Sequence, residues 1–247
     1  MKRNAFIITA SHFGPMIVNR FDFSICPKDL AILPGVGGDI LEYNEYKRQS
    51  IDACFGVIKS RYDKFGEGVV VLDIGANIGA YTLGWAHRMH EWGSILAIEA
   101  QERVFYALAG NVAINNCFNV QVIWGIVAEK SGFMIVPELE QCRFTNFGGL
   151  SLIGKDLEDR NEYKELGKVK IQAIAIDDFK LPRVDFIKID VQGMELDVLN
   201  GAKETIARCK PAIVIENNFG SDEYCNAITN YRCREFDDSD LIMEPFD

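Results

Sequence analysis

A continuous apolar run that ends in a glycine-rich turn constrains the fold of this chain more than any other feature. Val69–Leu72 comprises three valines and one leucine, and residues 75–79 (GANIG) follow after Asp73 and Ile74. An unbroken β-branched run is typical of a strand that is buried on both faces of a parallel sheet. The glycines after it predict a tight turn into a helix, which we expect over residues 80–91.

Strand and helix patterns alternate through the rest of the chain and predict repeated βα units. Helical stripes indicate one helix over 101–116 and another within 190–211. Repeated βα units predict the α/β class, with a mostly parallel sheet and helices on both faces. The further strands are expected at 94–98, 120–126, 184–189 and 212–215, with an antiparallel pair at 133–136 and 169–176 and the last strands within 227–236 and 241–245.

The first 65 residues have a different pattern, and we predict that they form a small N-terminal extension. Two short strand-like segments, Ala5–Thr9 and Pro15–Arg20, precede a loop rich in proline and glycine at residues 33–38. Residues 42–64 have apolar side chains at helical spacing. Since 247 residues fit one α/β domain, residues 66–247 are predicted to form a single domain after this extension of a strand pair and a helix.

The glycine turn also indicates which ligand it would bind. A dinucleotide fingerprint starting at Gly75 needs a second glycine at position 77, where this chain has Asn77. A phosphate-binding loop needs Gly-Lys-Ser/Thr, but Gly79 is followed by Ala80 and Tyr81. The turn therefore favours a nucleoside ligand without a phosphate group to hold.

Glu99 lies at the end of the second predicted strand, where a carboxylate can accept hydrogen bonds from both hydroxyls of a ribose. A glycine turn with a ribose-binding acid and no phosphate loop predicts S-adenosylmethionine as the cofactor. Asp73 and the turn are expected at its methionine end, and Gln101 and Val127 near its adenine. The full set of predicted cofactor-binding residues is Asp73, Gly75, Ala76, Asn77, Gly79, Tyr81, Thr82, Glu99, Ala100, Gln101, Val127, Ala128 and Asp190.

Three segments resemble the FkbM family of methyltransferases. They are residues 73–82 (DIGANIGAYT), residues 146–152 (NFGGLSL) and residues 185–202 (DFIKIDVQGMELDVLNGA), and the similarity extends over about 68–217. The resemblance implies a Rossmann-like class I methyltransferase sheet of seven strands, with the last strand antiparallel. It also implies S-adenosylmethionine as methyl donor and methylation of a hydroxyl on a sugar or secondary metabolite.

Polar residues at the ends of the fourth and fifth predicted strands are the catalytic candidates. Lys188 and Asp190 lie on one side of the same strand, and a lysine in such an apolar strand needs a charged partner. Asp190 is expected to face the methyl acceptor, as a base or as a metal ligand, and Glu216 is the third candidate. Oxygen ligands from Asp190, Glu216 and Asn217 would suit Mg²⁺, but we favour a site without metal because Lys188 already supplies positive charge.

Composition limits the partners and the location. Net charge is −10, which disfavours nucleic acid and leaves a small molecule or a saccharide as the expected acceptor. No apolar run reaches the roughly 18 residues of a membrane span. Seven cysteines without C-x-x-C spacing favour reduced thiols and a cytoplasmic location.

Two other functional classes are compatible with the predicted fold. One is an NAD-type oxidoreductase on the same sheet, against which Asn77 argues. The other is a non-catalytic nucleoside-binding module, which only a measurement of turnover separates from an enzyme. Methylation of nitrogen or of a macromolecule is a further alternative. The sequence leaves the oligomeric state, the identity of the acceptor and the choice between O- and N-methylation open.

Overall fold

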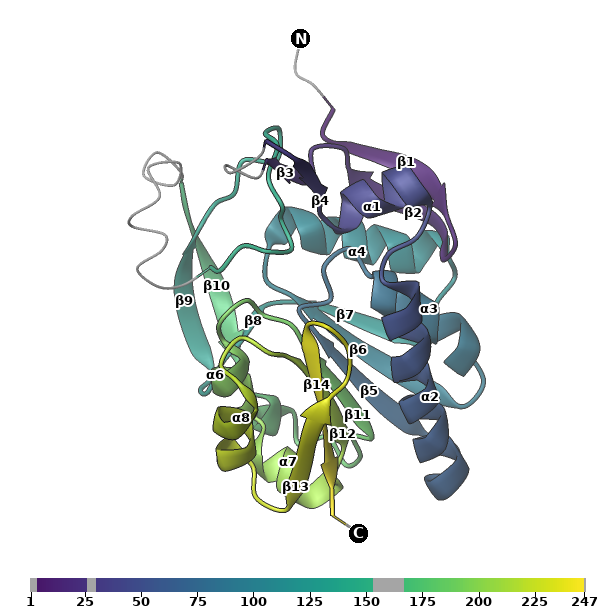
Figure 1. Ribbon diagram of the computed structural model, residues 1–247, viewed down its shortest axis with the longest axis vertical. Helices are drawn as coiled ribbons and strands as arrows, with labels where there is room; N and C mark the ends of the chain where they lie inside the picture. Colours follow the sequence, from purple (N-terminus) through teal and green to yellow (C-terminus); the bar gives the residue numbers. More distant parts are fainter. Residues whose placement is uncertain (1–3, 26–29, 153–166, 247) are drawn as a thin grey trace.

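Figure 1 shows the computed structural model, which describes residues 4–25, 30–152 and 167–246. A seven-stranded sheet has the order β13-β14-β12-β11-β5-β6-β7. Strand β14 runs antiparallel to its neighbours β12 and β13, and the other neighbouring pairs are parallel. The predicted α/β class and the Rossmann-like, mostly parallel sheet with an antiparallel last strand are confirmed. The strands are β5 (Val69–Ile74), β6 (Gly93–Glu99), β7 (Val120–Trp124), β11 (Phe186–Ile189), β12 (Ala212–Glu216), β13 (Tyr231–Glu235) and β14 (Asp240–Pro245).

Helices cover both faces of this sheet, as the βα pattern predicts (Figure 1). One apolar core joins the sheet to α2 (Arg48–Phe65), α3 (Ala80–Met89) and α4 (Glu102–Ile114). The other joins it to α6 (Glu195–Asn200), α7 (Lys203–Cys209) and α8 (Ser221–Ala227). Strand β5 is central because it pairs with β6 on one side and β11 on the other. Its apolar run is therefore buried on both faces.

The N-terminal residues pack into the same core as the sheet. Strands β1 (Phe6–Ser11) and β2 (Gly14–Asn19) form the predicted antiparallel pair, and a second short pair is β3 (Phe23–Ile25) with β4 (Ile32–Pro34). Met16 and Ile58 belong to the cluster that contains Val71 of β5. This shared burial ties the proposed extension, residues 1–65, to the domain that follows.

The predicted single helix over 42–64 is wrong in its first part. Two helices occur instead, α1 (Val36–Tyr43) and α2, because Asn44 and Lys47 between them have left-handed backbone conformations with φ of 61° and 38°. Residues 36–38, assigned to a loop from their glycines, begin α1. A buried carboxylate explains this, because Asp22 accepts a hydrogen bond from the first-turn N–H of Gly37 at 2.7 Å.

A small second sheet lies beside the main one. Strand β10 (Lys168–Ile174) pairs antiparallel with β9 (Gly132–Pro137), as predicted, and parallel with β8 (Ile126–Val127). The predicted strand 120–126 therefore ends at Trp124, and the chain leaves the main sheet at Gly125. A β-carbon on Gly125 would lie 2.5 Å from the side chain of Ile174, so the glycine allows this close passage. Within the described ranges, no helix is both long and apolar enough to cross a membrane.

The position of Gly75 leads to a test of the fold. Its φ is +78°, and a β-carbon there would lie 1.8 Å from the carbonyl oxygen of Asp190. Gly75→Ala should lower the free energy of unfolding by about 2 kcal/mol or more, since strain at positive φ adds to overpacking. Gly56→Ala, in an open position on α2, should raise it by about 0.5–1 kcal/mol. Urea denaturation of both variants measures the difference, and equal stability of Gly75→Ala and wild type would contradict the packing described here.

Candidate active site

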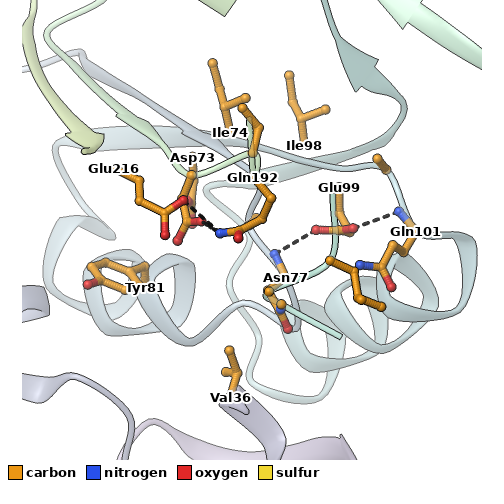
Figure 2. Close-up of a pocket in the computed structure, with 18 of the residues that line it drawn as sticks. Val36, Asp73, Ile74, Asn77, Tyr81, Ile98, Glu99, Gln101, Gln192 and Glu216 are labelled. Atoms are coloured by element: carbon orange, nitrogen blue, oxygen red, sulfur yellow. Dashed lines mark hydrogen bonds between the residues drawn. The ribbon is translucent and has the colours of Figure 1, made fainter. Parts of the chain in front are cut away.

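A cavity of about 380 Å³ opens at the carboxyl ends of β5, β6, β11 and β12 (Figure 2). This is the edge of an α/β sheet where ligands bind, and the volume suits a small molecule. The walls also include residues 34–36, 46–47 and 146–152 outside the main sheet. Predicted cofactor residues that line the cavity are Asp73, Gly75, Ala76, Asn77, Tyr81, Glu99, Ala100, Gln101, Val127 and Asp190.

Glu99 is buried at the end of β6, and backbone groups hold its carboxylate. One oxygen accepts the N–H of Asn77 at 2.9 Å and the other accepts the N–H of Gln101 at 2.7 Å, as Figure 2 shows. Burial raises the pKa of Glu99 to about 7, although these hydrogen bonds oppose the shift. Each oxygen keeps a second lone pair, so the carboxylate can still accept hydrogen bonds from two ligand hydroxyls.

Asp73 lies near the end of β5, and one of its carboxylate oxygens has no hydrogen-bond partner among the described residues. Its Oδ2 accepts a hydrogen bond from the hydroxyl of Thr82 at 2.6 Å, whereas its Oδ1 is buried without a partner among the described residues. Burial raises the pKa of Asp73, against the charge of Lys188 and the Thr82 hydrogen bond. An unsatisfied buried carboxylate oxygen is costly. A charged donor is the kind of group that would satisfy such an oxygen.

Lys188 is a buried ammonium group with carboxylates around it. Its Nζ lies 3.1 Å from Asp190 Oδ2 and 4.6 Å from the centre of the Tyr81 ring, and β-sheet register places Lys188 beside Asp73. Burial acts to lower its pKa, but Asp190 and Asp73 hold the pKa well above its usual value. Burial acts to raise the pKa of Asp190. The charge of Lys188 and the hydrogen bond from Gln192 outweigh this effect, so the pKa is lowered. The ion pair is therefore fully charged near neutral pH.

Gln192 connects the carboxylates of Asp190 and Glu216, at the end of the cavity formed by β11 and β12. Its side-chain amide nitrogen donates to Asp190 Oδ1 at 2.9 Å and to Glu216 Oε2 at 2.8 Å. Figure 2 shows the hydrogen bond to Glu216. Burial and the charge of Asp190 raise the pKa of Glu216 to about 7. The strand ends thus bring together the three catalytic candidates, Lys188, Asp190 and Glu216.

Four predicted site residues do not line the cavity. Gly79 is the residue directly before α3, Thr82 donates a hydrogen bond to Asp73 from within that helix, and Ala128 packs in the apolar cluster of the small sheet. Asn217 is exposed, and its Oδ1 accepts the N–H of Gly220 at 3.0 Å. Among the described residues, no group of three or more His, Cys, Asp or Glu side chains could hold a metal ion, and the magnesium set of Asp190, Glu216 and Asn217 stays a prediction.

Asp22 organises walls of the cavity that the sequence analysis did not identify. Its buried carboxylate accepts the N–H groups of Gly37 at 2.7 Å and Phe147 at 3.0 Å, and Phe147 O in turn accepts the side-chain amide of Gln101 at 2.6 Å. A β-carbon on Gly35 would lie 2.2 Å from Asp22 Oδ1. One carboxylate therefore joins α1, the segment around 147 and the end of β6. The glycine-rich loop at 33–38 was the available signal in the sequence. Asp22 and Phe147 are 125 residues apart, so no local pattern indicated their contact.

Comparison with known proteins agrees with this geometry. A sequence profile described as the methyltransferase FkbM domain matches residues 73–244, which is most of the chain. This chain belongs to the FkbM methyltransferase family. The resemblance found in the sequence is therefore confirmed, and family membership supports methyl transfer over the NAD-type oxidoreductase alternative.

Two fungal relatives of this FkbM-family chain have similar length. It is 25% identical over 207 residues to Methyltransferase 1 of Beauveria bassiana, covering 77% of this chain and 79% of the relative. It is 26% identical over 199 residues to Methyltransferase sdnD of Sordaria araneosa, covering 69% of this chain and 73% of the relative. The crystal structure of methyltransferase FkbM from Methylobacillus flagellatus KT matches with a TM-score of 0.51 and 18% identity. That match covers 71% of this chain and 43% of the other, and it supports the fold.

Asp22 gives a test of how this FkbM-family site is built. Asp22→Ala leaves two buried N–H groups without an acceptor and should lower the free energy of unfolding by about 1–3 kcal/mol. Asp63→Ala, which removes an exposed carboxylate on α2, should change it by less than about 0.5 kcal/mol. Thermal and urea unfolding measure both variants. Equal effects of the two substitutions would show that Asp22 does not hold these segments.

Proposed function

We propose that this protein transfers the methyl group of S-adenosylmethionine to a hydroxyl group on a sugar or a small secondary metabolite. The observation that carries the proposal is that Asp73, whose Oδ1 is buried without a partner among the described residues, lines one cavity together with Glu99. When bound, S-adenosylmethionine supplies an activated methyl group on a positively charged sulfur. The chain has to orient the acceptor oxygen, exclude water and remove one proton.

Residues along the cavity offer hydrogen-bond acceptors for the amino and hydroxyl groups of the cofactor. Asp73 Oδ1 would accept the ammonium group, and Glu99 would accept the two ribose hydroxyls. Gln101 Oε1 is buried without a partner among the described residues and would accept an adenine amino group, with Val127 lining the same part of the cavity. Asn77 occupies the position where a pyrophosphate would need glycine, which supports a nucleoside without phosphates.

The acceptor would bind at the end of the cavity that holds Asp190, Gln192 and Glu216. Carboxylates and an amide can exchange hydrogen bonds with the hydroxyls of a polyol. Tyr46 and Lys47 from the N-terminal residues line the same cavity and would limit the size of the acceptor. The net charge of −10 supports a small acceptor over nucleic acid. A cytoplasmic location stays an expectation from the cysteine pattern.

Cofactor identity is tested by calorimetry. S-adenosylmethionine and S-adenosylhomocysteine should bind with micromolar affinity, whereas NAD should not bind. Glu99→Ala should weaken binding by about 1.5–3 kcal/mol, the scale of hydrogen bonds to a charged group, and Glu129→Ala, outside the cavity, should leave it unchanged. Binding of NAD without binding of S-adenosylmethionine would refute the proposal.

Catalysis and the acceptor class are tested by product formation. S-adenosylhomocysteine release should depend on an added sugar or polyol, and mass spectrometry should find the methyl group on its oxygen. Release of product with amines alone would contradict O-methylation. A chain that binds the cofactor without turnover on any acceptor would favour the non-catalytic alternative.

Metal dependence is tested on the same reaction. Excess EDTA should leave the rate within about twofold, because Lys188 already balances the charge of Asp190. Loss of turnover with EDTA and recovery with added Mg²⁺ would contradict this expectation.

A further inference from the structure

We infer that Glu216 accepts the proton of the acceptor hydroxyl, and that Gln192 positions Glu216 for this step while Asp190 serves as the permanent partner of Lys188. The inference rests on the proposed function and assigns separate tasks to the two carboxylates at the acceptor end. It differs from the expectation that Asp190 itself is the base.

The Gln192 bridge is fixed by its own surroundings. Gln192 has a left-handed backbone with φ of 55°, which is strained for this residue type. On either side of it, the N–H groups of Val191 and Gly193 donate to the buried carboxylate of Glu195 at 3.2 and 3.1 Å. Asn218 donates to the same carboxylate at 3.2 Å and to Glu216 Oε2 at 2.8 Å. The amide of Gln192 is therefore held between Asp190 and Glu216.

The two carboxylates differ in their charge partners. Asp190 pairs with Lys188 at 3.1 Å, so protonating it would leave a buried ammonium group without its closest counter-charge. Glu216 has no ion pair within the part of the chain that the structure describes. The groups that face it are Asp190, Gln192, Glu195, Asn218 and, across the β12–β14 pair, Asp240. Nearby negative charge and burial make Glu216 the carboxylate that can take up a proton near neutral pH.

The free oxygen of Glu216 is available for the acceptor. Both amide hydrogen bonds go to Oε2, and Oε1 receives none from the described residues. The proton would move from the acceptor hydroxyl to Oε1 as the hydroxyl oxygen forms its bond to the methyl carbon. The electron pair of the breaking carbon–sulfur bond stays on sulfur. Because Glu216 is half-buried, the proton can then pass to water.

The experiment compares Glu216→Gln, Asp190→Asn and Gln192→Ala in the full chain. Methyl transfer to methyl α-D-glucopyranoside is followed in single turnovers between pH 5 and 9, with S-adenosylhomocysteine affinity and Tm measured on each protein. The wild-type rate should fall as pH drops through about 7, because only ionised Glu216 accepts the proton. Glu216→Gln should lose about 10²–10⁴-fold in rate and this pH dependence, while affinity stays within about threefold and Tm is retained.

The other two variants separate positioning from catalysis. Gln192→Ala should move the pH dependence to higher pH, because the lost hydrogen bond lowers the pKa of Glu216 in wild type. Asp190→Asn should lower Tm, since Lys188 loses its ion pair. The inference is overturned if Glu216→Gln keeps the rate within about threefold, or if Asp190→Asn abolishes transfer with an unchanged Tm.

A carboxyl titration decides the inference independently of the acceptor. Glu99 and Glu216 both have pKa values raised to about 7, so ¹³C NMR of the S-adenosylhomocysteine complex is compared between two variants. One carboxyl signal that titrates near pH 7 should be lost in Glu216→Gln and retained in Glu99→Gln. Absence of such a signal in wild type refutes the inference. If the complex forms but the glucoside is not methylated, the acceptor proposed above is wrong and the titration still decides the role of Glu216. If no complex forms, the cofactor proposal itself fails.

Discussion

The ammonium group of Lys188, buried in the middle of a parallel sheet, is the constraint on which the site depends. A buried charge is tolerated only when it is paired, and Lys188 has Asp190 directly after the end of its own strand and Asp73 on the neighbouring strand. This requirement places two carboxylates at the strand ends where the cavity opens. The same arrangement leaves Asp73 with an oxygen for a cationic ligand and keeps Asp190 ionised.

Charge balance also explains why neighbouring acids at this sheet edge behave differently. Asp190 pairs with Lys188 and its pKa is lowered. Glu216, one strand further, receives hydrogen bonds from two side-chain amides in the described part of the chain, and its pKa is raised to about 7. Glu99 reaches a similar value through burial. Residues of one chemical type thus acquire separate tasks from their surroundings. In a methyltransferase, a carboxylate that titrates near neutral pH is suited to remove a proton from a hydroxyl.

The N-terminal residues are part of the site, although they precede the region that matches the family. Asp22 connects α1 to the segment around Phe147, and Tyr46 and Lys47 line the cavity. These contacts make the first 65 residues part of the cavity wall.

The sequence by itself determined the sheet and the residues that line the cavity at the glycine turn and the end of β6, because these depend on local patterns. The apolar run of β5, its glycine turn and Glu99 lie within about 30 residues, and each has a short-range physical signature. Helix α1 and the end of β7 were misjudged, since Asp22 and Ile174 act on them from distant positions. Only the tertiary structure showed the hydrogen bonds of Asp22, Gln192 and Glu216. Their hydrogen bonds and pKa values arise from burial and from neighbours brought together by folding, which a linear pattern does not encode.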